Sequence, residues 1–249
     1  MKKLIISILS VITILIAIAW GAIKFYPEKL MPIFIRPQLE ASRKISNSFH
    51  EKDGIVVVTV GTATPLPGER AQTGTAVFIN GHFFMFDIGA GVVQKSENIG
   101  LPLTQLDGIF FTHYHSDHMM DLPNMISRSW VLGRTGDLHI YGPDSLTTIV
   151  NTANSFLTIE NEYRLDHHGP EVIDITKAKG IPHEYHIEQN SSVVVFQKDG
   201  ITITAFDVNH EPIEPAVGYM IEYNGKKVII SGDTKRNELL EKWHRTVTF

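Results

Sequence analysis

The stretch that decides the fold is Phe111–Pro123, FTHYHSDHMMDLP, which places three histidines and an aspartate within six positions. It follows an apolar run that is typical of a buried strand. On a loop that leaves the end of a strand, His113 and His115 can point into one cleft, while Asp117 and His118 turn toward a second position beside it. Neutral imidazoles and a carboxylate at this spacing suit a divalent metal such as zinc, or a pair of such ions.

The composition is that of a globular protein. The chain has 249 residues, 43% hydrophobic and 20% charged, which is enough for one large core or two half-cores. Its net charge is −5 and no long basic run is present, so we do not expect nucleic acid as a partner. Cysteine is absent, so a metal would be held by histidine, aspartate or glutamate.

The N-terminus is a separate segment. After two lysines come twenty positions without a charge, Leu4–Ile23, which are long enough to cross the roughly 30 Å core of a bilayer. We therefore predict a transmembrane anchor over residues 1–24. A cleaved signal peptide is the alternative, because residues 17–19 form a small-x-small pattern. Either reading predicts a catalytic domain outside the cytoplasm, periplasmic or extracellular, and a secreted one if the segment is cleaved. Residues 25–53 are expected to be a juxtamembrane connector.

From residue 54 the pattern changes to strands, helices and turns, which predicts an α/β domain over residues 54–249. The expected strands are residues 55–60, 75–79, 82–86, 108–111, 138–141, 193–197, 201–208, 217–223 and 227–230. The expected helices are one that ends near Gly100, residues 122–132, residues 144–159 and a short one after residue 234. Two Asn-Gly pairs, at 80–81 and 224–225, predict tight hairpin turns. Residues 167–189 are loop-like and have no assigned element.

Five segments in this order resemble the metallo-β-lactamase-fold hydrolases, particularly the branch shared by tRNase Z and arylsulfatase-like enzymes. They are GTATPLPGERAQTGTAVFI, FDIGAG, FTHYHSDHMMDLP, VNHEPIEPAVGYMI and VIISGDT. The resemblance implies an αβ/βα sandwich with a two-metal site at the edge where the two halves meet.

The resemblance also implies roles for individual residues. In the family's motif, His113, His115 and His210 match the first metal site, Asp117 and His118 match ligands of the second, Asp233 matches the bridging carboxylate, and Asp87 matches an aspartate that supports the site without ligating it. Asp117 and Asp233 would then be catalytic as well as metal-binding. His167 and His168 are candidate substrate-binding residues at the rim, although a polar surface loop explains them equally well.

The expected function is that of a membrane-anchored, zinc-dependent hydrolase that uses a metal-bound hydroxide on small-molecule ester substrates, namely sulfate, phosphate or carboxylic esters. Two zinc ions would occupy a complete site. One alternative is a tRNase Z-like phosphodiesterase or ribonuclease, and another is a remnant that binds one metal without turnover. The predicted anchor favours the ester hydrolase, and so does the short span between Tyr219 and Gly232, where some members carry a tRNA-binding arm.

The C-terminus departs from the family pattern. Relatives continue past Gly-Asp-Thr to a strand that ends in His-Glu and to a later strand with the last second-site histidine, whereas this sequence ends at Phe249. We therefore expect a truncated, incomplete second half, a weak or missing second zinc and impaired turnover. The codons that can encode residues 242–249 permit a shifted frame that resembles the family, which suggests a frameshifted tail.

Overall fold

The computed structural model describes residues 12–13, 20–21, 24, 49, 54–66 and 68–244. The chain divides into two units, Met1–Lys44 and Ile45–Phe249, and the fold described below is that of the second. The predicted membrane segment at residues 4–23 and the connector at 25–53 fall largely outside the described residues. Among the residues that are described, no helix is both long enough and apolar enough to cross a membrane.

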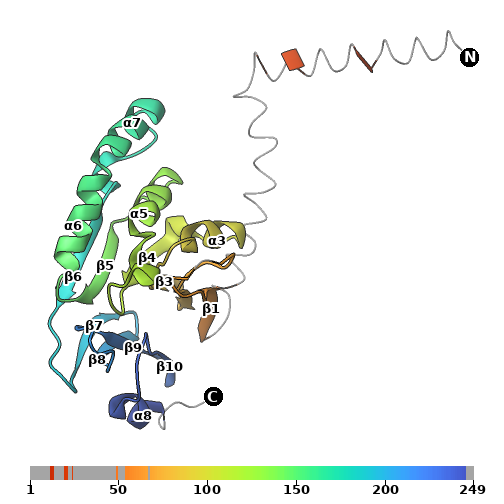
Figure 1. Ribbon diagram of the computed structural model, residues 1–249. Helices are drawn as coiled ribbons and strands as arrows, with labels where there is room; N and C mark the ends of the chain where they lie inside the picture. Colours follow the sequence, from red (N-terminus) through yellow and green to blue (C-terminus); the bar gives the residue numbers. More distant parts are fainter. Residues whose placement is uncertain are drawn as a thin grey trace, which may run out of the picture. The chain divides into compact units, whose positions relative to one another are not determined.

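The first sheet has six strands and is mixed (Figure 1). The strands lie in chain order and are β1 (Ile55–Gly61), β2 (Gly74–Ile79), β3 (His82–Phe86), β4 (Leu106–Phe110), β5 (Leu138–Pro143) and β6 (Gly180–Tyr185). The pairs β1–β2 and β2–β3 are antiparallel, and the pairs from β3 to β6 are parallel. The carboxyl ends of β3, β4 and β5 therefore meet at one edge of the sheet, where ligand sites of α/β folds are usually found.

The second sheet is antiparallel throughout, in the order β10-β9-β8-β7. Its strands are β7 (Ser192–Lys198), β8 (Ile201–Asp207), β9 (Val217–Tyr223) and β10 (Lys226–Ile230). Both predicted Asn-Gly hairpins are confirmed. Asn80 and Gly81 have φ of 48° and 79°, and Asn224 and Gly225 have φ of 48° and 74°, the left-handed pair that such a two-residue turn requires.

Helices cover the outer face of each sheet. The helices of the described residues are α3 (Val92–Asn98), α4 (Ser116–Met119), α5 (Leu122–Val131), α6 (Leu146–Phe156), α7 (Thr158–His168) and α8 (Glu238–His244), with short 3-10 turns at Leu103–Gln105 and Ile175–Lys177. Residues of α3, α5 and α6 share one core with the first sheet. Leu239, Leu240 and Trp243 of α8 pack against Phe206 of the second sheet.

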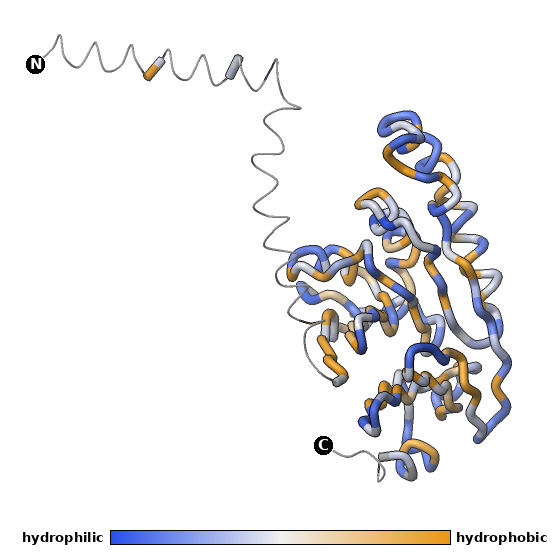
Figure 2. The backbone as a smooth tube through the Cα atoms, turned by 180° about the vertical axis from the view of Figure 1, so that it is seen from behind, coloured by the Kyte–Doolittle hydropathy of each residue, from blue (hydrophilic) through white to orange (hydrophobic). Residues whose placement is uncertain are grey.

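The alternation of side chains along β2 explains the layers. Ala76 and Phe78 point into the core beneath the helices, whereas Val77 and Ile79 point into a second core shared with the antiparallel sheet. Because both faces of β2 are buried, its sequence is a continuous apolar run rather than an alternating one. Figure 2 shows hydrophobic segments along the strands of both sheets. The predicted αβ/βα sandwich is confirmed.

Two expectations about elements were wrong. The sequence predicts one helix over residues 144–159, but the helix is interrupted at Leu157, whose φ is −82° and ψ −5° and whose side chain is buried in the core, and α7 follows as a separate helix. The sequence predicts a loop-like segment over residues 167–189, yet this segment contains β6. This strand lies at the edge of the first sheet, where Pro182 is tolerated although it lacks an N–H for the ladder.

Candidate metal centre

The motif loop, residues 111–118, begins where β4 ends, inside the sandwich. Phe110 and Phe111 are fully buried and anchor the loop on both sides. His113 follows with no exposed surface, and α4 then carries Asp117 and His118, which are 6% and 1% exposed. The loop therefore presents its polar side chains from within the protein, at the carboxyl edge of the parallel strands.

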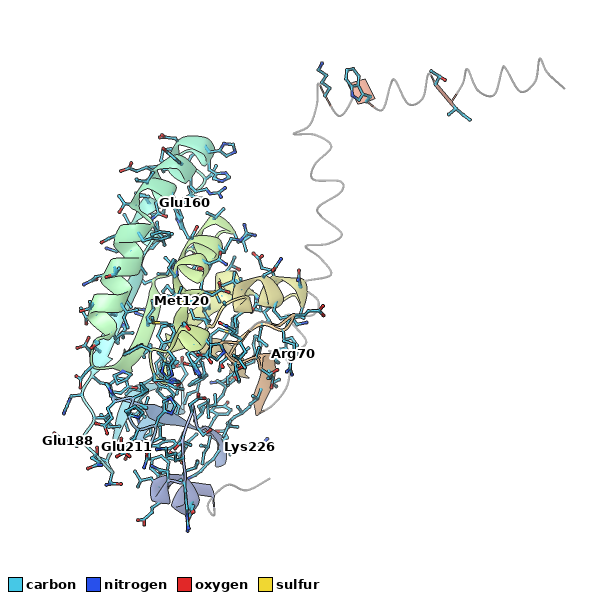
Figure 3. The ribbon with its side chains drawn as sticks, viewed as in Figure 1. Arg70, Met120, Glu160, Glu188, Glu211 and Lys226 are labelled. Atoms are coloured by element: carbon cyan, nitrogen blue, oxygen red, sulfur yellow. The ribbon has the colours of Figure 1, made fainter. Side chains whose placement is uncertain are left out.

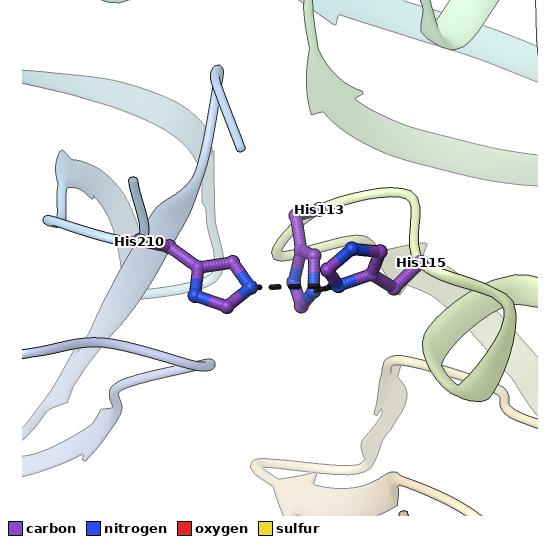
Figure 4. A group of neighbouring side chains, drawn as sticks. All are labelled: His113, His115 and His210. Atoms are coloured by element: carbon purple, nitrogen blue, oxygen red, sulfur yellow. Dashed lines mark hydrogen bonds between the residues drawn. The ribbon is translucent and has the colours of Figure 1, made fainter. Parts of the chain in front are cut away.

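Three imidazoles converge at this edge, from both halves of the fold (Figure 4). The Nδ1 atom of His115 lies 3.0 Å from Nε2 of His113 and 3.4 Å from Nε2 of His210. A tetrahedral zinc ion with bonds of about 2.0–2.1 Å would place two ligand nitrogens roughly 3.4 Å apart. The triad of His113, His115 and His210 therefore fits one divalent cation without rearrangement of the backbone.

A second group lies beside the first and contains His118 and Asp233. Nε2 of His118 is 3.6 Å from Oδ1 of Asp233 and 3.8 Å from Oδ2 of Asp117. This nitrogen is buried and has no hydrogen-bond partner among the residues that the structure describes. A buried polar atom without a partner is costly, and a cation held by this nitrogen and the two carboxylates would remove that cost. His113, His118 and Asp233 also lie close enough to share one ion.

Asp87 anchors the motif loop through hydrogen bonds of its carboxylate. It follows β3, and its Oδ1 atom accepts a hydrogen bond of 2.8 Å from the backbone N–H of Thr112. Its Oδ2 atom accepts a bond of 2.9 Å from Nδ1 of His118. Nδ1 of His118 carries the proton that it donates in this bond, so Nε2 keeps a free lone pair. That lone pair faces the cluster, as a metal ligand requires. The structure thus places Asp87 outside both groups of ligands and in contact with one of them.

The pKa values reflect this crowding. Burial, together with the neighbouring histidines, lowers the pKa of His113 to about 3. Burial alone would also lower the pKa of His118, but the hydrogen bond and charge of Asp87, with Asp233 and Asp117, raise it above the usual value. His113 is therefore a neutral imidazole near pH 7, which is the form that binds a metal.

The second half supplies its residues through loops fixed to the first half. The backbone N–H of Val217 donates to the carbonyl of Thr112 at 2.9 Å, and the hydroxyl of Tyr219 donates to the carbonyl of Phe111 at 2.6 Å. Asp233 follows Gly232, whose φ of 61° suits glycine. These bonds join the start of β9 directly to the motif loop, so that His210 and Asp233 reach the cluster.

The structure does not bring His167 and His168 to this cluster. They end α7, which continues from α6 past the amino ends of the parallel strands, where the side chains of Asn154 and Asn161 bind the backbone at Gly180 and Ala178. The histidine motif lies at the carboxyl ends of the same strands. Glu160, on α7, and Glu211, beside His210, accordingly lie far apart in Figure 3.

The sequence did not identify two residues that position the metal centre, Thr112 and Tyr219. Thr112 bonds to Asp87 through both its backbone and its side chain, and Tyr219 bonds to the loop from β9. No feature of the sequence alone marked Thr112, because its role depends on its contacts with Asp87 and His113. No sequence signal identified Tyr219, since an aromatic residue in a buried strand is more often only part of the core.

Comparison with known proteins supports the fold. Residues 82–248 match a family model described as a β-lactamase superfamily domain. A ribonuclease Z of Mycolicibacterium gilvum (strain PYR-GCK) is 32% identical over 184 residues, which cover 72% of this chain and 62% of the relative. The chain therefore spans less than two thirds of that relative's length.

Two solved structures share the fold at low identity. The metallo-β-lactamase fold protein YhfI from Bacillus subtilis has a TM-score of 0.57 and 19% identity, over 77% of this chain and 68% of its own. The short form of human tRNase Z (ELAC1) has a TM-score of 0.53 and 22% identity, over 72% and 68%. At these identities the likeness extends to the fold alone.

The comparisons contradict the expected substrate and partner. The sequence was expected to encode an arylsulfatase-like hydrolase of small esters for which nucleic acid was not a partner, but the curated relatives carry the name ribonuclease Z. The net charge of −5 misled that expectation, because it averages over the whole chain and says little about one face of it.

The predicted location outside the cytoplasm was also wrong, because the same relatives contradict it. A membrane-anchored catalytic domain outside the cytoplasm was inferred from one apolar segment, whereas the relatives are named for cleavage of RNA. The physical basis of that inference was only the length of an uncharged run, which does not by itself establish a membrane span.

Proposed function

The chain belongs to the β-lactamase superfamily, and on that premise we propose that it is a metal-dependent hydrolase that cleaves phosphodiester bonds in RNA. The observation that carries the proposal is the 32% identity to a ribonuclease Z, together with two groups of ligand side chains at one edge of the sandwich. We place the hydrolase domain at residues 54–249.

Two divalent cations, for which we propose zinc, would supply Lewis-acid polarisation of the phosphoryl group and activation of water at neutral pH. His113, His115 and His210 would hold one of them, and His118 with Asp117 would hold the other. The side chain of Asp233 is 52% exposed, so it is the carboxylate that solvent and substrate reach. We propose that Asp233 would help to hold both cations, and that the negative charges of Asp117 and Asp233 would retain them.

A polar cavity of about 720 Å³ adjoins His210 and is lined by Asn209 and Glu211 among others. Its lining also includes Glu214, Asp207 and Glu238, which with Glu211 and Asp144 outnumber the basic side chains of Arg236 and His186, so it is acidic on balance. Phosphates are repelled by such a surface, whereas ribose hydroxyls and base edges can donate hydrogen bonds to it. We expect Glu214→Gln to change KM for RNA without changing the zinc content. An unchanged KM would place the RNA elsewhere.

The test uses the purified full chain, loaded with zinc, and three substrates: a precursor tRNA with a 3′ trailer, an aryl phosphodiester and an aryl sulfate. We expect cleavage of the RNA, loss of cleavage after chelation, recovery with zinc, and loss in His210→Ala. His167→Ala is the matched control, because this histidine is exposed, lies at the end of α7 and is outside both ligand groups.

Absence of RNA cleavage by a chain that holds zinc would overturn the proposal. If such a chain also held only one ion, the result would favour the remnant that binds metal without turnover.

A further inference from the structure

The hydroxyl of Thr112 lies between the carboxylate of Asp87 and the ring of His113. Its Oγ1 atom is 2.9 Å from Oδ2 of Asp87 and 3.0 Å from Nδ1 of His113. All three side chains are buried, with exposed fractions of 2% or less. No solvent is therefore available to replace either bond, and the three groups must satisfy one another.

The count of protons fixes the direction of both bonds. An ionised carboxylate only accepts, and a hydroxyl has a single proton to donate. If Thr112 gave that proton to His113, its oxygen would face the carboxylate of Asp87 lone pair to lone pair at 2.9 Å. The hydroxyl therefore donates to Asp87 and accepts from Nδ1–H of His113. That leaves Nε2 of His113 bare, and this atom is the one that points at His115.

The same carboxylate oxygen also accepts from Nδ1 of His118. We propose that Thr112 is a positioning residue that extends the control of Asp87 to His113, so that one carboxylate sets the tautomer of a histidine in each ligand group. The proposal rests on the proposed metal centre but not on RNA as the substrate.

The remainder of Thr112 fits this role. Its carbonyl accepts the backbone N–H of Val217, and a Cβ added at Gly232 would meet its Cβ at 2.8 Å. The side chain is thus clamped between β3, the motif loop and the segment that leads to Asp233. Serine keeps the hydroxyl in that place, and valine keeps the shape without the hydroxyl.

The experiment reads histidine tautomers by ¹⁵N NMR in the metal-free full chain, at a pH above the raised pKa of His118, so that both rings are neutral. In Thr112→Val we expect His113 to lose its single Nδ1–H tautomer, while His118 keeps its own through the direct bond to Asp87. In Thr112→Ser we expect both tautomers to be retained. Asp87→Asn should disturb both histidines, and asparagine tolerates the backbone φ of 56° at this position.

Zinc affinity gives the second measurement. Loss of an outer hydrogen-bond partner of a ligand histidine typically weakens metal binding about 10- to 100-fold. We expect a loss of this size in the valine variant and a change under about threefold in the serine variant. An unchanged His113 tautomer with wild-type affinity in Thr112→Val would overturn the proposal.

Loss of the His113 tautomer or of zinc affinity in Thr112→Ser would also overturn the proposal, because serine keeps the hydroxyl on which the proposal depends. If the valine variant does not fold, as the His118 signal would report, the contrast between Asp87→Asn and Thr112→Ser decides. The tautomers are read without metal or substrate, so their outcome is independent of whether the chain cleaves RNA.

Discussion

At the scale of single residues, Asp87 combines an uncommon backbone with a central position. Its φ of 56° lies in the left-handed region, which aspartate enters more easily than most residues because of its short polar side chain. This conformation ends β3 and turns the carboxylate beneath the motif loop, where it accepts three hydrogen bonds. Strain of this kind is retained where surrounding contacts determine it, and here those contacts hold two histidines of the cluster.

A prediction at this scale concerns His186, which is outside the metal centre. Nδ1 of His186 is 2.6 Å from Oδ2 of Asp144, and this hydrogen bond and the charge of Asp144 raise its pKa above the usual value. The pair favours the folded state below the unfolded pKa of about 6.5, and this contribution is lost as pH rises through the folded pKa. We expect Asp144→Asn to lower the pKa of His186 in an NMR titration. The His183 signal is the internal control, and no change at His186 would contradict the assignment.

At the scale of elements, Gly89 packs the segment after β3 against the motif loop. A Cβ at Gly89 would lie 1.9 Å from the carbonyl oxygen of Asp117, so any side chain must displace α4. We expect Gly89→Ala to destabilise the protein by roughly 1–3 kcal/mol and to weaken zinc binding, because Asp117 and His118 move together. Chemical denaturation and zinc titration measure the two effects.

The matched control for this prediction is Gly136→Ala. A Cβ at Gly136 has nothing within 4 Å, so its effect on stability should stay within about 1 kcal/mol and its zinc affinity should be unchanged. Equal losses of stability and zinc affinity in Gly89→Ala and Gly136→Ala would show that the contact between Gly89 and Asp117 does not position the motif loop.

A second prediction at this scale concerns the attachment of β6. The side chain of Asn154 on α6 donates to the carbonyl of Gly180 and accepts from its N–H, both at 2.9 Å. Asn154→Ala would leave both backbone groups of an edge strand without these partners, which costs about 1–3 kcal/mol. Asn151→Ala, an exposed asparagine on the same helix, is the control and should change the free energy of unfolding by less than about 0.5 kcal/mol. Similar losses in both variants would contradict the attachment.

Elements were predictable from the sequence where local chemistry and packing agree. The two Asn-Gly hairpins and the strand before the histidine motif follow from turn chemistry and apolar runs. β6 was not predictable in this way, because GIPHEY contains a glycine and a proline and is held by Asn154 and by pairing with β5. The interruption of the helix at Leu157 likewise has no breaker in the sequence, and the side chain of Leu157 lies in the tertiary core.

The residues of the candidate site also differ in how far the sequence alone predicts them. The spacing of the motif predicts that His113, His115, Asp117 and His118 lie together, and the structure places them on one short segment, with Asp117 3.8 Å from His118. His210 and Asp233 needed the resemblance to a family, since only the fold brings them within reach of that loop. Thr112 depends on which atom donates to which, and that information exists only in three dimensions.

At the scale of the whole molecule, the metal centre lies at a junction that an apolar core already joins. Phe86 and Phe110 of the first sheet pack with Tyr219 and Ile203 of the second, all fully buried. The two halves therefore hold together through hydrophobic burial. The ligand groups add polar contacts across the same junction, because His113 and His115 come from the first half, and His210 and Asp233 from the second.

A ligand that binds only the folded state stabilises it, and at 100 times its dissociation constant the gain is about 2.7 kcal/mol. For a chain of this size, such a gain raises Tm by roughly 5–10 °C. We expect zinc to raise the Tm of the metal-free protein by this amount in calorimetry, and hydrogen exchange to slow in the loops around His210 and Asp233, which the ion would connect to the motif loop. His210→Ala removes the contribution of the second half to the triad, so most of the shift should disappear at the same zinc concentration, whereas His186→Ala should keep it. An equal shift in the His210 variant would mean that zinc binds within one half only, and the centre would then not join the two sheets.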